Sequence, residues 1–98
     1  MEVKLMEKSY SYPIDYDWTK EQMEDVVNVW RMVELAYEKG IDREEFLLKY
    51  KKFKKVIPAI GEEKRWGKKF EDISNYSLYR VVKEAQTSTK KNIHLIEK

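Results

Sequence analysis

The fold is decided by one stretch, Trp18-Thr-Lys-Glu-Gln-Met-Glu-Asp-Val-Val-Asn-Val-Trp-Arg-Met-Val-Glu-Leu-Ala-Tyr-Glu-Lys-Gly40. Thr19 followed three residues later by Gln22 is a capping box, in which each side chain accepts a hydrogen bond from the other residue's backbone N–H. Gly40 supplies the left-handed residue that commonly ends a helix. The stretch therefore predicts a long helix that is capped by Thr19 and runs to Lys39.

This helix carries apolar side chains on two faces. At about 100° per residue, one stripe is typical of a helix packed on a core, and its members are Met23, Val26, Trp30, Val33 and Tyr37. Met32 and Leu35 lie on the far side of the second half. Either the helix is central and covered from both sides by its own chain, or this second face contacts a partner or a second subunit.

Three further helices are predicted downstream. Asp42 and Glu45 form a second capping box, and the helix they start ends at Pro58. Its apolar stripe is Phe46, Tyr50, Phe53 and Ile57. The next helix runs from about Glu62 to Ser74 with an apolar stripe of Trp66, Phe70 and Ile73, and Asn75 can adopt the left-handed conformation that ends it. The last helix starts at Asn75 or Ser77 and carries Leu78, Val81, Val82 and Ala85.

The helices predict an all-α domain, a compact irregular array of about four helices with the long first helix at its centre. We assign residues 1–98 to this single domain and expect residues 1–9 and 87–98 to be frayed or peripheral tails. Val3 and Leu5 at one end, and Ile93 and Leu95 at the other, alternate with polar residues as strands would. Frayed ends are nevertheless favoured over strand pairing.

An aromatic arm precedes the first helix, and contains Tyr10, Tyr12, Tyr16 and Trp18. Pro13 blocks helix formation and biases the residue before it toward extended backbone. The arm either packs over the helices or docks onto a partner. The candidate protein-contact face is therefore Tyr10, Tyr12, Tyr16, Met32 and Leu35.

Several short motifs occur in a characteristic order between about Tyr10 and Ala85. Among them are Tyr10-Ser-Tyr-Pro-Ile-Asp15, Asp17-Trp-Thr19, Ala36-Tyr-Glu-Lys-Gly-Ile41, Val56-Ile-Pro58 and Tyr76-Ser-Leu-Tyr-Arg-Val-Val-Lys83. In this combination the chain resembles uncharacterised protein family 0223 (UPF0223), small proteins of low-GC Gram-positive bacteria. The resemblance implies an irregular array of roughly four helices and a cytoplasmic bacterial protein, but no activity and no catalytic residues. Ala59-Ile-Gly61 departs from the family pattern, which puts the start of the third helix in doubt.

The net charge of +2 hides an uneven distribution. Residues 1–48 hold 12 acids and 6 bases, whereas residues 49–69 hold 2 acids and 9 bases. The candidate basic surface is Lys51, Lys52, Lys55, Arg65, Lys68 and Lys69. It could follow nucleic-acid phosphates, but Tyr50 and Phe53 are core positions, and the lysines suit the end of a helix dipole. A solvated face or an acidic protein partner is therefore favoured over nucleic acid.

Composition excludes much chemistry. There is no Cys and one His, His94, so thiolate and multi-histidine metal sites are excluded. We expect no catalytic residues, no cofactor, no metal and no membrane span, and we expect a cytoplasmic location. The predicted function is a non-enzymatic protein-interaction or regulatory module, acting on another protein or on a second copy; the alternative is a nucleic-acid or ribosome-associated protein.

Overall fold

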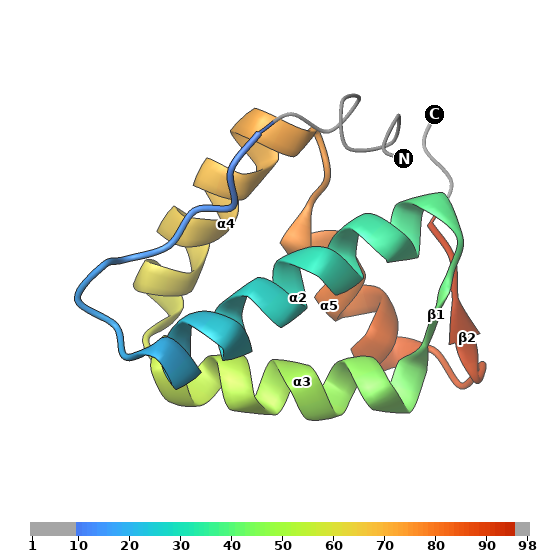
Figure 1. The fold of residues 1–98 in the computed structure, drawn as a ribbon. Coiled ribbons are helices and arrows are strands. Elements are labelled where there is room, and N and C mark those ends of the chain that lie inside the picture. Colours follow the sequence, from blue (N-terminus) through green and yellow to red (C-terminus); the bar gives the residue numbers. More distant parts are fainter. Residues whose placement is uncertain (1–9, 96–98) are drawn as a thin grey trace.

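A computed structural model gives the fold and describes residues 10–95. The described chain contains four helices and two short strands, which are α2 (Lys20–Glu38), β1 (Ile41–Asp42), α3 (Arg43–Val56), α4 (Ile60–Ser74), α5 (Leu78–Thr87) and β2 (Asn92–Ile93) (Figure 1). The predicted helical array is confirmed, and the two strands are a small addition to it.

Local signals set both ends of α2. The backbone N–H of Gln22 donates to Thr19 Oγ1 at 3.1 Å, and that of Thr19 donates to Gln22 Oε1 at 2.9 Å, so the predicted capping box is formed. Gly40 follows the helix with a φ of +102°, which an L side chain rarely adopts. The chain can therefore turn sharply there into β1 and α3.

α2 is the central element, as predicted. Five of its residues are 0% exposed, and these are Val26, Val29, Trp30, Val33 and Ala36. The Trp30 ring stacks on Phe70 of α4 with centroids 4.7 Å apart and meets Phe53 of α3 edge to face at 5.6 Å. Trp30 therefore joins three helices in one core.

α3 returns antiparallel to α2 (Figure 1). Asp42 starts it, because its side chain accepts from the N–H of Glu45 at 2.8 Å. Phe46 and Phe53 are fully buried, as the stripe predicts. The antiparallel arrangement puts the acidic start of α2 at the same end of the molecule as the basic end of α3.

α4 and α5 complete the array. α4 starts at Ile60, two residues before the predicted Glu62, and Ala59 gives it no side-chain cap. Trp66 and Phe70 are buried as predicted. Ile73 is 41% exposed, so the prediction that it belongs to the buried stripe is wrong. Asn75 ends α4 in the left-handed conformation, with a φ of 69°.

The C-terminal tail is ordered where fraying was predicted, so that prediction is wrong for residues 92–95. β2 pairs antiparallel with β1, with Ile93 opposite Ile41. Ile93 is 2% exposed and Leu95 is 9% exposed, and the Leu95 N–H donates to the Ala36 carbonyl at 2.9 Å. β1 therefore finds its partner strand in the C-terminal tail, and the apolar residues of the tail are buried there. The predicted tail 1–9, with Val3 and Leu5, lies outside the described residues.

Candidate functional site

Two tyrosines of the arm hold a buried carboxylate of α2. The hydroxyls of Tyr10 and Tyr12 both donate to Glu34, Tyr12 over 2.7 Å, and Glu34 is only 8% exposed. Burial, and then the hydrogen bond to Glu34, raises the pKa of Tyr12 to about 12 and raises the pKa of Tyr10 above its usual value. Both phenols therefore stay protonated at neutral pH and act as donors to Glu34.

The rest of the arm is anchored at two more points. The Trp30 indole N–H donates to the Pro13 carbonyl at 3.0 Å, and Trp18 packs against Trp66 of α4 with ring centroids 5.0 Å apart. Tyr16 is different, because it is 85% exposed. The arm thus packs over the helices, which was one of the two alternatives, and leaves Tyr16 as its accessible ring.

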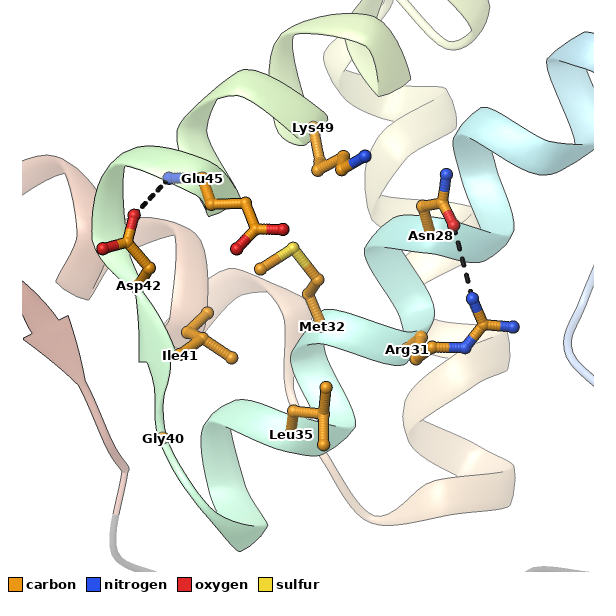
Figure 2. Close-up of a pocket in the computed structure, with 9 residues that line it drawn as sticks. All are labelled: Asn28, Arg31, Met32, Leu35, Gly40, Ile41, Asp42, Glu45 and Lys49. Carbon is orange, nitrogen blue, oxygen red and sulfur yellow. Dashed lines mark hydrogen bonds between the residues drawn. The ribbon is translucent and has the colours of Figure 1, made fainter.

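Met32 and Leu35 line a hollow of about 390 Å³ between α2 and the start of α3 (Figure 2). Met32 points from α2 toward α3 and is 8% exposed, so its own chain largely covers it. Leu35 is half-buried. The hollow's other lining residues are Asn28, Arg31, Gly40, Ile41, Asp42, Glu45 and Lys49.

The rim of this hollow carries both signs of charge. Arg31 and Lys49 supply cations, and Asp42 and Glu45 supply carboxylates. Asp42 is already used, because its side chain accepts from the N–H of Glu45 (Figure 2). The mixed rim therefore selects neither an anionic nor a cationic ligand.

The five predicted contact residues do not form one surface. Tyr10 and Tyr12 bind Glu34, whereas Met32 and Leu35 lie about 160° and 100° around α2 from Glu34. Tyr16 is the exposed member, and Leu35 is half-buried with no polar atom to bond. Contact of either residue with a partner stays a prediction.

The predicted basic surface is divided between two helices. On α3, Lys51, Lys52 and Lys55 line a shallow hollow of about 400 Å³ with Glu45, Leu48 and Lys49. No lysine of this hollow forms an ion pair within the described residues. Leu48, which the sequence analysis did not single out, is 66% exposed in the middle of this positive charge.

The three predicted cations of α4 have neighbours of their own. Arg65 pairs with Glu62, and Lys68 Nζ lies 3.0 Å from Asp72 Oδ1. Arg65 and Lys69 each lie 5.7 Å from the centre of the Trp66 ring. Arg65 and Lys68 are therefore partly neutralised by carboxylates of their own helix, and none of the three cations lines the hollow on α3.

The aromatic rings of α3 point away from its lysines, as predicted. Phe53 is fully buried, and the Tyr50 hydroxyl donates to Glu63 Oε2 at 2.6 Å. Glu63 Oε1 also lies 2.7 Å from Lys54 Nζ, so this carboxylate ties α3 to α4. Burial, and then the bond to Glu63, raises the pKa of Tyr50. Neither ring is free to stack on a base.

Sequence reasoning missed the most apolar groove, which lies between α4 and α5 and reaches Tyr50 of α3. Its volume is about 510 Å³. Ile60 and Tyr79 stand in it with 65% and 67% of their surface exposed, and Leu78 and Val82 form its base. The remaining lining residues are Tyr50, Glu63, Lys64, Gly67, Lys68, Glu71, Ser77 and Gln86. The available signal was that Ile60 and Tyr79 are large apolar residues outside the predicted stripes.

Two structural findings bear on other classes of function. Within residues 10–95, no three His, Asp or Glu side chains gather as metal ligands would. In the same part of the chain, no helix combines the length and the apolar composition needed to cross a bilayer.

A model of a protein family, described as "Uncharacterised protein family (UPF0223)", matches residues 9–94. The chain belongs to the UPF0223 family. This membership confirms the resemblance seen in the sequence. The UPF0223 protein of Enterococcus faecalis is 51% identical over 79 residues, which are 81% of this chain and 86% of that protein.

Other UPF0223 proteins match over similar lengths. The protein of Streptococcus sanguinis is 44% identical over 90 residues, which are 92% of this chain and 98% of that protein. The protein YktA of Bacillus subtilis is 51% identical over 79 residues, which are 81% of this chain and 90% of YktA. These names state no activity, so the function of this UPF0223 chain has to be argued from its surfaces.

Proposed function

We propose that this UPF0223 chain is a non-enzymatic protein-binding module whose α4–α5 groove receives an apolar segment of a partner protein. The observation that carries the proposal is the exposure of two large apolar side chains, Ile60 and Tyr79, in a groove with an apolar base. Burying a large apolar side chain contributes about 1.5 to 3 kcal/mol. Tyrosine is also among the residues that most often dominate binding energy at interfaces.

The size and lining of the groove favour a short segment over a small polar metabolite. A volume of about 510 Å³ holds a few side chains. Leu78 and Val82 offer apolar surface at the base, while Lys64, Lys68 and Glu71 stand on α4 beside it. An apolar base with a polar rim is the usual anatomy of a protein interface.

The placement of the buried carboxylate supports a role without catalysis. Among the described residues, Glu34 is the one charged residue that is buried. Its carboxylate accepts hydrogen bonds from the hydroxyls of Tyr10 and Tyr12. A catalytic acid or base needs to reach a reacting atom. Glu34 instead holds the arm to α2. The cytoplasmic location stays a prediction.

The proposal is tested by affinity capture from a bacterial lysate, with Tyr79→Glu as the disruptive variant. Because Tyr79 is 67% exposed, the substitution places a charge in the groove without opening the core. We expect a protein that the wild type retains to be retained at least about tenfold less by this variant. Circular dichroism checks that the helices remain.

Tyr16→Glu is the matched control, since Tyr16 is also a largely exposed tyrosine ring and lies outside the groove. Retention by Tyr16→Glu together with loss by Tyr79→Glu supports the groove. Equal retention by Tyr79→Glu and wild type contradicts it. Loss with Tyr16→Glu alone moves the contact to the arm.

Contact with nucleic acid is the second candidate. One observation favours it, namely that four lysines of α3 lack ion-pair partners within the described chain, and these are Lys49, Lys51, Lys52 and Lys55. Against it, Tyr50 and Phe53 are turned inward, so the face offers no stacking ring. If it binds nucleic acid, log affinity should fall linearly with log salt concentration.

A further inference from the structure

We infer that the exposed face of α3 binds an acidic amphipathic helix of a partner protein, with one apolar side chain of that helix seated on Leu48. We name this face the lysine face, and it consists of Leu48, Lys49, Lys51, Lys52 and Lys55. It is a second surface, separate from the α4–α5 groove, and does not depend on the function proposed for that groove.

Helix geometry places an apolar point among the charges. At about 100° per residue, Lys55 lies about 20° from Leu48 around the α3 axis, and Lys51 and Lys52 lie on either side of that line. Leu48 is 66% exposed at this point. A shallow hollow with a volume of about 400 Å³ surrounds it. The face therefore offers one hydrophobic anchor at the start of a row of cations that follows it along α3.

The positive charge of the lysine face is not neutralised within the molecule. None of its lysines forms an ion pair in the part of the chain that the structure describes. Lys54, by contrast, is bound to Glu63 on the neighbouring side of α3. An approaching carboxylate would thus meet four cations without displacing an existing partner, which favours an acidic occupant.

The spacing of the lysines fits a helix. Lys51 and Lys55 are one turn apart, and one helical turn advances about 5.4 Å. Glutamates at positions i and i+4 of a partner helix have the same spacing. Leu48 lies one turn before Lys51, so a leucine one turn before the first glutamate of a parallel partner helix would fall on Leu48, and both the charges and the apolar groups would be paired.

Nucleic acid and membrane fit this face less well. A phosphate backbone has no apolar group to pack against an exposed leucine. Tyr50 and Phe53 are turned away from the lysines. An interfacial membrane helix needs a broad apolar face, whereas this face has one leucine. The observations favour a protein segment.

The test uses a synthetic acidic peptide of about 20 residues, long enough to form helix, with glutamates at i and i+4 and a leucine one turn before the first of them. Amide NMR spectra of the full chain are recorded during the titration. We expect saturable binding, with signal changes at Leu48 and the neighbouring lysines. The variant Lys51→Gln, Lys52→Gln, Lys55→Gln should lose binding, and Leu48→Ser should weaken it about tenfold.

The control variant Lys20→Gln, Lys90→Gln, Lys91→Gln removes the same charge from exposed lysines elsewhere, and should bind as the wild type does. Tyr79→Glu should also bind the peptide normally, which separates this inference from the groove. Loss of binding in Tyr79→Glu would assign the peptide to the groove and overturn the inference.

Three other outcomes overturn it. The first is an absence of saturable signal changes on α3. The second is equal affinity of Leu48→Ser, since binding by charge alone needs no anchor. The third is tighter binding of a uridine oligonucleotide than of the peptide with the same lysine dependence, which would assign the face to nucleic acid.

Discussion

Glu34 shows how one residue can fix an entire segment. Its carboxylate lies in the core at 8% exposure, and the hydroxyls of Tyr10 and Tyr12 both donate to it. A buried carboxylate without donors costs several kcal/mol. The two phenols remove that cost, and their burial attaches the arm to α2. The arm is therefore held by polar bonds as well as by ring packing.

The tyrosines make stability depend on alkaline pH. Tyr10, Tyr12 and Tyr50 all have a raised pKa in the fold, about 12 for Tyr12 against 10.0 when unperturbed. Above about pH 10 the unfolded chain loses these protons first, so their stabilising contribution is complete below pH 10 and is lost as pH rises through the folded pKa. We expect the free energy of unfolding, measured with denaturant, to fall between about pH 10 and about pH 12.

The control for this prediction is the double variant Tyr10→Phe, Tyr12→Phe. It should be less stable at neutral pH, by about 1 to 3 kcal/mol, because Glu34 loses its donors. Its decline above about pH 10 should be shallower, with Tyr50 still contributing. An unchanged slope would show that the arm tyrosines do not titrate as described.

α4 contains a glycine that its helix does not require. A Cβ at Gly67 would lie 3.6 Å from Leu78 Cδ2, which is ordinary van der Waals contact. Gly67→Ala should therefore raise the free energy of unfolding by about 0.5 to 1 kcal/mol, because it removes freedom from the unfolded chain. Gly40→Ala should lower it, since φ there is +102°. A loss of stability in Gly67→Ala would mean that α4 and α5 approach more closely.

Helix ends were predictable where a local signal fixes them, and contacts between distant segments were not. Thr19 and Gln22 are three residues apart, and Asn75 acts through its own backbone, so both appear in the sequence. Ile93 instead pairs with Ile41, 52 positions away, and its alternation alone could not show whether a partner strand existed. The α4–α5 groove was missed for the same reason. The exposure of Ile60 and Tyr79 depends on how α4 and α5 pack against each other.

At the scale of the whole molecule, the chain closes on α2 from opposite ends. The arm packs Trp18 onto Trp66, while the C-terminal segment packs Ile93 and Leu95 beside β1, at the other end of the array (Figure 1). Both ends join one contiguous core through α2. If that core is cooperative, damage at one end must lower the stability of the other.

Ile93→Ala tests this cooperativity. The truncation of a fully buried isoleucine should cost about 2 to 4 kcal/mol, a large part of the about 5 to 15 kcal/mol typical of a domain. Thermal unfolding is followed by helical circular dichroism and by tryptophan fluorescence, to which Trp18, Trp30 and Trp66 contribute. We expect both transitions to shift to the same lower temperature. A fluorescence transition that stays at the wild-type temperature would show that the β1–β2 end unfolds independently of the core around Trp30.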